Sequence, residues 1–72
     1  MNIYLVIMGC DGQDDIDIEG CFQSIESARN KVKILLEEHR DKNWFESFKD
    51  SWKRPCGGRY EYISIYVRDL LP

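Results

Sequence analysis

The sequence predicts an α+β fold: a three-stranded antiparallel sheet (strand order 2-1-3) with one long helix on one face and a short aromatic helix near the other. A continuous apolar run near the start is typical of a strand covered on both faces. A middle stretch has helical periodicity, and a final segment alternates between aliphatic and tyrosine residues. A chain of 72 residues is expected to form a single domain over 1–72.

The first strand is expected over 2–9, where every residue from Ile3 to Met8 is apolar. A turn rich in Gly and Asp follows over 10–15. The next residues alternate, with Ile16, Ile18 and Phe22 on one side, which indicates a half-buried second strand antiparallel to the first. The first strand therefore takes the centre of the predicted sheet.

A long amphipathic helix is expected next. Ser24 is a suitable N-cap, and Glu26 in the first turn complements the helix dipole. At 100° per residue, one apolar stripe is formed by Ile25, Ala28, Val32, Leu35, Leu36 and His39. Ile34 falls on the opposite side among charged residues, where it is a minor indication of a contact surface.

A short second helix is expected after Asn43, which forms a capping-box pattern with Glu46. The large aromatic residues of this segment repeat at helical spacing: Trp44, Phe45, Phe48 and Trp52. The helix should end before Pro55, because proline disfavours helical backbone in the residue that precedes it. Gly57-Gly58 continues the turn.

The last strand is expected over 59–68. Its aliphatic side (Glu61, Ile63, Ile65, Val67) should meet the long helix together with Ile18 and Phe22. Its other side (Tyr60, Tyr62, Ser64, Tyr66, Arg68) should lie on the opposite face, with Tyr4, Val6 and Met8 if the hairpin register allows it. A wet face would make so short a chain marginally stable. Either the aromatic helix or a second copy of the protein is therefore expected to cover this face.

The chain carries 13 Asp+Glu against 10 Lys+Arg, a net charge of −3, which argues against a general nucleic-acid or membrane-surface binder. It has no apolar run of about 18 residues. Its start at Met1 lacks the features of a signal peptide, so a cytoplasmic location is expected. The odd number of cysteines (Cys10, Cys21, Cys56) predicts free thiols, and these thiols lack the paired spacing with His39 of a zinc site. We expect no metal and no cofactor.

The chain is also expected not to be an enzyme. It contains none of the phosphate-binding, metalloprotease or serine-hydrolase motifs. The acidic loop that starts at Asp11 differs from a calcium loop, because Ile16 stands where that loop needs a glycine.

The charge distribution indicates a protein-binding module, since residues 1–22 contain five acids and no base. An acidic hairpin attracts a basic surface, such as one on a host protein. The predicted partner-binding residues are Asp14, Asp15, Asp17, Glu19, Trp44, Phe48 and Trp52. Alternatively, the acids only solvate a loop and protect an edge strand.

A second hypothesis places a ligand on the tyrosine face. Tyr60, Tyr62 and Tyr66 offer aromatic rings on which a nucleotide or single-stranded nucleic acid stacks. The negative net charge disfavours phosphate binding, so nucleic acid is not the expected partner. The alternative is that these tyrosines are buried under the aromatic helix.

The pattern Gly20-x-Phe22-x-Ser24-x-Glu26-x-Ala28 follows a strand, an acidic hairpin and a second strand. With the amphipathic helix and the tyrosine-rich last strand, it resembles a group of small uncharacterised proteins from bacteriophages and bacteria. The resemblance covers 3–38 and 60–67, and the segment 44–52 departs from it. It implies a cytosolic accessory protein that inhibits or redirects host machinery, in the host cytoplasm if phage-encoded, and it carries over no catalytic residue.

Overall fold

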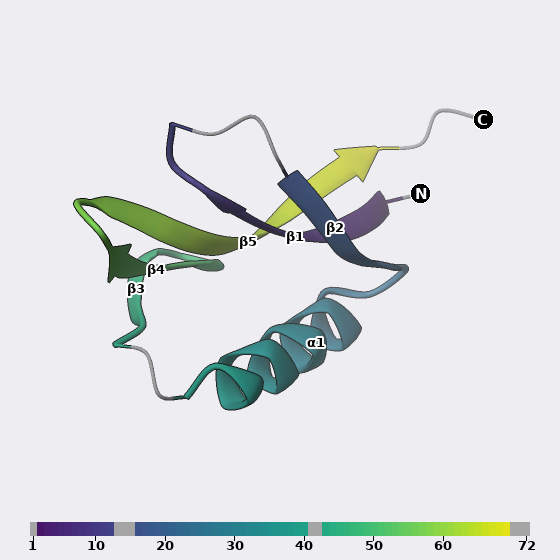
Figure 1. Ribbon diagram of the computed structural model, residues 1–72. Helices are drawn as coiled ribbons and strands as arrows, with labels where there is room; N and C mark the ends of the chain where they lie inside the picture. Colours follow the sequence, from purple (N-terminus) through teal and green to yellow (C-terminus); the bar gives the residue numbers. More distant parts are fainter. Residues whose placement is uncertain (1, 13–15, 41–42, 70–72) are drawn as a thin grey trace.

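The computed structural model describes residues 2–12, 16–40 and 43–69. Its elements in chain order are β1 (Asn2–Cys10), β2 (Ile16–Phe22), α1 (Ile25–Glu38), β3 (Phe45–Phe48), β4 (Ser51–Cys56) and β5 (Arg59–Asp69). The strands form one five-stranded antiparallel sheet of order β2-β1-β5-β4-β3, with α1 on one face (Figure 1). The α+β class is confirmed, whereas the predicted three-stranded sheet of order 2-1-3 is wrong because two further strands extend it.

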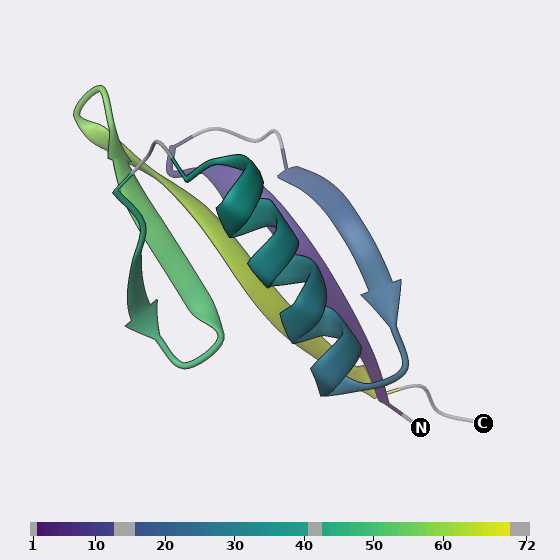
Figure 2. The ribbon, with the colours of Figure 1, turned by 90° about the horizontal axis from the view of Figure 1, so that it is seen from below.

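The additional strands come from the segment predicted as a short aromatic helix. This segment forms the β3–β4 hairpin, which lies beside α1 and adds two strands to one edge of the sheet (Figure 2). Asp50 has a φ of 60°, a left-handed conformation that Asp tolerates in tight turns, and it reverses the chain. Among the described residues β3 pairs with residues 51–53, so Pro55 lies where these residues leave the edge of β4 unpaired, as strand prolines do.

β1 pairs with β5 along the whole length of β1, from Asn2 opposite Asp69 to Cys10 opposite Glu61. The first and last described residues therefore lie at the same end of the sheet (Figure 1). β4 and β5 are joined through Gly57 and Gly58, whose φ values of 57° and 82° suit a two-residue hairpin turn. The predicted turn at these glycines is thus a hairpin.

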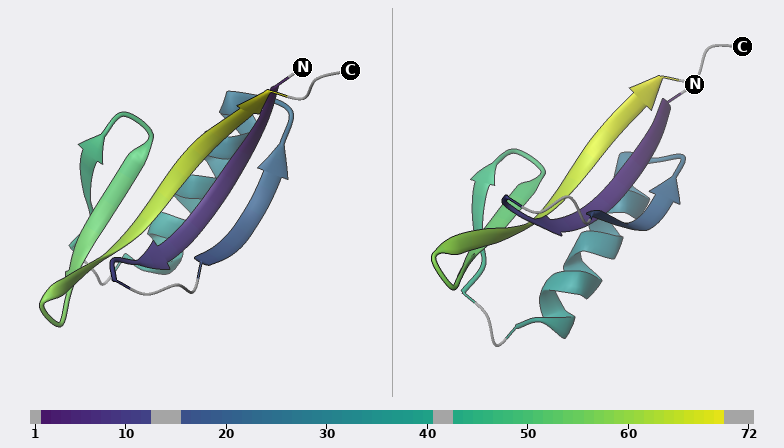
Figure 3. Two further views of the ribbon diagram at one scale, coloured as in Figure 1. Left: turned by 90° about the horizontal axis from the view of Figure 1, so that it is seen from above. Right: turned by 45° about the horizontal axis from the view of Figure 1, so that its top comes forward.

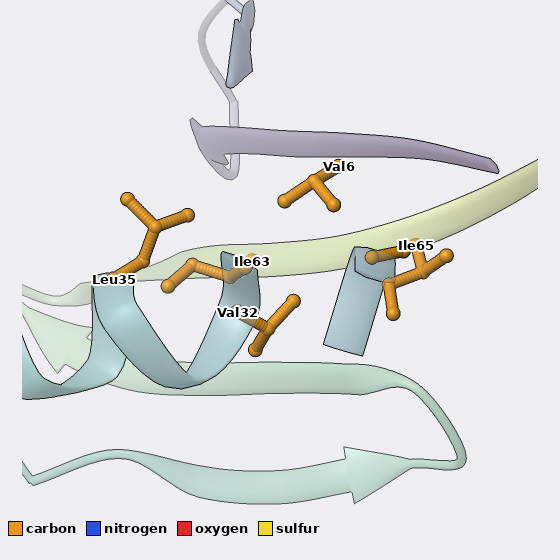
Figure 4. Packing of buried hydrophobic residues seen from close by; sticks show 6 residues of the cluster. Val6, Val32, Leu35, Ile63 and Ile65 are labelled. Carbon is orange, nitrogen blue, oxygen red and sulfur yellow. The ribbon is translucent and has the colours of Figure 1, made fainter. Parts of the chain in front are cut away.

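α1 begins as predicted, because the Ser24 hydroxyl oxygen accepts a hydrogen bond from the Ser27 backbone N–H at 3.1 Å. The helix packs across β1, β2 and β5. The core between helix and sheet contains Val6, Ala28, Val32, Leu35, Ile63 and Ile65 (Figure 4). Full burial of each large aliphatic side chain contributes about 1.5–3 kcal/mol.

The hairpin register, which the sequence left open, decides which face of the sheet each side chain of β1 occupies. Tyr4, Val6 and Met8 lie on the α1 side of the sheet, opposite Val67, Ile65 and Ile63 of β5. The prediction that they share the tyrosine face is therefore wrong. A shift of one residue in register exchanges the two faces of a strand, and the sequence alone does not determine it.

A β-bulge at Glu19 changes which side chains of β2 point toward α1. The register shifts at this point, so that Ile18 lies opposite Ile7 on the side away from the helix. Phe22 stays on the helix side and packs against the core. The prediction that α1 covers Ile18 is wrong, because the extra residue reverses the alternation.

The sheet face opposite α1 has no helix over it among the described residues (Figure 3). The molecule is 18 Å along its shortest axis. A molecule of this thickness has room for the sheet and for one further layer, the helix, packed about 10 Å from the sheet. The expectation that an aromatic helix covers this face is wrong, since that segment is part of the sheet.

Candidate functional site: the open face of the sheet

The candidate site is the sheet face turned away from α1, which we call the open face. The strand register places on it Ile3, Leu5, Ile7, Ile16, Ile18, Phe45, Phe48, Ser51, Lys53, Tyr60, Tyr62, Ser64, Tyr66 and Arg68. Six of its large apolar side chains are exposed: Ile16, Ile18, Phe45, Phe48, Tyr60 and Tyr66. Contiguous exposed apolar patches mark interaction surfaces.

The β2–β1 side of the open face is aliphatic. Ile16 and Ile18 of the edge strand β2 are 52% and 68% exposed. Ile18 lies opposite Ile7, which is buried, and Leu5 lies opposite the exposed Tyr66. The two exposed isoleucines therefore lie beside the apolar side chains of β1.

The β3–β4 side of the open face is aromatic. The rings of Phe45 and Tyr60 meet edge to face, with centroids 6.1 Å apart and an interplanar angle of 85°. Lys53 Nζ lies 5.7 Å from the centroid of the Tyr60 ring. Phe48 is 75% exposed. This side offers rigid aromatic rings, the kind of group that anchors protein interfaces.

A polar hollow of about 290 Å³ lies on the same face, lined by Asp11, Ser51, Lys53, Tyr62, Ser64 and Tyr66. Lys53 Nζ is 3.7 Å from Asp11 Oδ2, and the hydroxyl oxygens of Ser51 and Ser64 are 2.8 Å apart. The two serine hydroxyls thus pair with each other, and the two charges of the hollow are of opposite sign.

Burial raises the pKa of Tyr62 above its ordinary value of 10.0, and the negative charges that Tyr66, Asp11 and Cys10 can carry act in the same direction. The Tyr62 hydroxyl therefore keeps its proton at neutral pH. It offers a ligand a hydrogen-bond donor and no negative charge.

The predicted acidic contact residues are only partly described. Asp14 and Asp15 lie outside the described residues. Asp17 is exposed on β2 opposite Met8, and Glu19 is half-buried at the bulge. Their place on an edge strand fits both a partner contact and protection of that edge against strand pairing.

The predicted aromatic contact residues lie on two different faces. Trp44 and Trp52 are half-buried and pack against the core on the helix side. The Trp44 indole Nε1–H also donates to the His39 carbonyl oxygen at 3.2 Å. Phe48 lies on the open face, opposite Ser51. The tryptophans and Phe48 lie on different faces because side chains alternate along a strand. A helix would have placed these aromatic residues on one stripe.

Tyr60, Tyr62 and Tyr66, the predicted alternative ligand residues, all lie on the open face. The interpretation that a helix buries them is wrong. Sequence reasoning missed Ile16 and Ile18 as site residues, because the bulge that turns them outward has no strong sequence signal.

A buried ion pair occupies the helix side of the sheet near the end of α1. Arg54 is 9% exposed, and its Nη2 pairs with Glu61 Oε2. The Arg54 guanidinium carbon lies 5.5 Å from the centroid of the Trp44 ring, and Cys56 Sγ donates to Glu61 Oε1 at 3.6 Å. Arg54 Nε finds no acceptor within the described part of the chain. The pair joins β4 to β5, and we give it a structural role.

Cys10, Cys21 and Cys56 are free thiols. In residues 2–12, 16–40 and 43–69, no three His, Cys, Asp or Glu side chains gather as metal ligands do. Over the same ranges, no helix combines the length and the apolar character that crossing a bilayer requires.

Comparisons of the chain with models of protein families, with curated proteins and with solved structures give no match. The function is therefore inferred from the geometry of the open face.

Proposed function

We propose that this chain is a small non-enzymatic binding protein that recognises another protein through its open face. The observation that carries the proposal is the gathering of six exposed large apolar side chains on one side of the sheet. Five strands about 4.8 Å apart and on average about 25 Å long present roughly 600 Å². This area approaches the ~800 Å² that each partner contributes to a standard interface.

The charges of the open face indicate the chemistry of its partner. Lys53 and Asp11 face each other within the hollow and balance each other's charge, and Arg68 adds a positive charge near the end of β5. Phe45, Phe48 and Tyr60 supply rigid aromatic anchors at one side. The fitting partner is a flat, weakly charged apolar surface, such as the face of another sheet, which packs about 10 Å away.

We place this activity in the cytoplasm, in an accessory role of the kind that the sequence resemblance implies. The three free cysteines support this location, because thiols persist in reducing compartments.

The test uses two isoleucines of equal exposure on opposite surfaces. Ile16 on the open face and Ile34 on the outer side of α1 are both 52% exposed. A partner captured from an extract of the source organism is identified, purified and titrated against both variants. Ile16→Glu should weaken its binding at least about tenfold, since it buries a charge in an apolar interface. Ile34→Glu should leave binding unchanged.

Equal affinities of the two variants would contradict the proposal. Sedimentation of the purified protein tests whether a second copy of the chain is the partner. A dimer that Ile16→Glu dissociates would show that a second copy, and not a different protein, covers the open face. Circular dichroism melting of both variants shows whether either substitution unfolds the protein.

Binding of a nucleotide or single-stranded nucleic acid is the second candidate. It is favoured by the exposed rings of Tyr60 and Tyr66, with Lys53 and Arg68 on the same face. Stacking on an aromatic ring contributes about 1–3 kcal/mol per base. A mixed-sequence oligonucleotide should then shift in a gel with the wild type and not with Tyr60→Ala/Tyr66→Ala. Absence of a wild-type shift at low salt removes this candidate.

A further inference from the structure

A groove lies between α1 and the β3–β4 hairpin on the helix side of the sheet. Figure 2 shows these two elements side by side. Its volume is about 360 Å³, and it is lined by Arg29, Val32, Lys33, Leu36, Glu46, Lys49, Asp50 and Trp52. Each of the four α1 residues has another of them three or four positions away, so they form one wall along successive turns of the helix. The groove lies on the opposite side of the sheet from the open face.

The groove exists because one helix is too narrow for this sheet. α1 packs over β1, β2 and β5. A helix with its side chains is about 10 Å wide, whereas five strands span roughly 24 Å. The β3–β4 hairpin therefore extends beyond the helix, and the space between them remains open.

Contacts at both ends hold the walls of the groove in place. Arg29 of α1 binds both carboxylate oxygens of Asp50, with Nε–Oδ1 and Nη2–Oδ2 distances of 3.0 and 3.3 Å. Ten residues further along, the His39 carbonyl oxygen accepts the Trp44 indole N–H. These contacts are about 15 Å apart along the helix. The groove is thus preformed, which lowers the entropic cost of filling it.

The groove is apolar inside and cationic at its rim. Val32, Leu36 and Trp52 line it with apolar surface. Lys33 on α1 and Lys49 on the hairpin turn are both exposed, and neither forms an ion pair within the described residues. Arg29 and Asp50 neutralise each other, and Glu46 is the remaining rim charge. The balance of Lys33, Lys49 and Glu46 is one positive charge.

We propose that this groove binds a small apolar molecule that carries one anionic group, such as an aromatic or aliphatic carboxylate. Its volume lies at the lower end of the range for small-molecule sites, about 300–1,000 Å³, which are mostly apolar with a few polar groups. The apolar body lies on Trp52 and Leu36, and the carboxylate lies between Lys33 and Lys49. This site is independent of the protein-binding function proposed above.

The probe is 2-naphthoate, with 2-naphthamide as a neutral molecule of the same shape. Binding is followed by NMR through the indole N–H signals of Trp52, which lines the groove, and Trp44, which does not line it. We expect 2-naphthoate to shift the Trp52 signal saturably. The amide should bind about fivefold more weakly, because it lacks the charge that two exposed lysines attract.

Lys33→Gln/Lys49→Gln tests the charge at the rim without touching the core. It should weaken 2-naphthoate binding about fivefold and remove the preference for the carboxylate. Lys31→Gln removes a charge from α1 outside the groove. It should change neither the affinity for 2-naphthoate nor the preference for the carboxylate. Ile16→Glu should bind the probe like the wild type.

Three results would overturn the proposal: an unmoved Trp52 signal at millimolar 2-naphthoate, equal binding by the double lysine variant, or shifts confined to open-face residues such as Tyr66.

Discussion

Arg29 of α1 and Asp50 of the β3–β4 turn form a two-point ion pair that ties the helix to the hairpin. The planar guanidinium matches the two carboxylate oxygens, which makes this geometry specific as well as attractive. The Asp50 carbonyl oxygen also accepts the Ile65 backbone N–H at 3.0 Å. One turn residue therefore contacts the helix through its side chain and β5 through its backbone.

Asp50→Asn should loosen the hairpin without unfolding the protein. Asn tolerates the left-handed φ of this position but lacks the charge that holds Arg29. We expect faster amide hydrogen exchange in β3 and β4 and unchanged exchange in β1. Glu37→Gln breaks the exposed Arg40–Glu37 pair and serves as the control, with no expected effect. Identical exchange in both variants would show that the pair does not hold the hairpin.

Gly20 and Phe22 form a second coupled pair. A Cβ added to Gly20 would lie 2.5 Å from the Phe22 ring, which packs against the core. Gly20→Ala should therefore displace the ring and lower the free energy of unfolding by about 1–2 kcal/mol. In a Phe22→Leu background the same substitution should cost much less, as a double-mutant cycle in urea would measure. Additive effects would refute the coupling.

Glu61→Gln should destabilise the fold strongly, because it leaves the charge of Arg54 buried without a counter-ion. The expected loss is about 3 kcal/mol in urea unfolding. Arg54→Met/Glu61→Leu removes both charges and should recover most of that loss. If the double variant is as unstable as Glu61→Gln, the role given to this ion pair is incorrect.

The raised pKa of Tyr62 predicts a pH dependence of stability. Burial, reinforced by Tyr66, Asp11 and Cys10, favours the neutral phenol in the folded state. The unfolded chain loses this proton near its ordinary pKa of about 10, so the stabilisation is full below that pH. It is lost as the pH rises through the higher pKa of the folded state.

Tyr62→Phe cannot ionise and should therefore flatten the alkaline part of this profile. Urea unfolding at about pH 9 and about pH 11 measures the difference. An equal decrease in the variant and the wild type would assign the alkaline effect to other groups.

The sequence allowed α1 to be predicted because its signals are local. Ser24, the first-turn acid Glu26 and the apolar stripe all lie within the helix or next to it, and the helix begins where they indicate. The pairing of the first strand with the second and last strands was also predicted correctly. Both faces of the first strand are apolar, which can be seen from its own residues. Such a strand has to lie in the interior of the sheet.

Residues 43–56 were mispredicted because their structure depends on distant partners. The aromatic spacing from Trp44 to Trp52 is compatible with one helix face or with two faces of a hairpin. Pairing with β5 selects the hairpin, and that pairing is not visible in the local pattern. The error also displaced the candidate site, because the predicted cover of the tyrosine face became part of the sheet.

The aliphatic half of the open face was missed for a smaller reason. One unpaired residue, Glu19, turns Ile16 and Ile18 away from α1. Residue identity indicates that these isoleucines belong to a strand, whereas their direction depends on the register. The tyrosines were placed correctly, since β5 pairs with β1 without interruption.

The pairing of Asn2 with Asp69 has a practical consequence for protein engineering. Segments fused before Asn2 or after Asp69 start from the same end of the sheet, while the hairpin turn between β4 and β5 lies at the opposite end (Figure 1). The chain is therefore a natural candidate for circular permutation, with a short linker across the old ends and new ends between the two glycines.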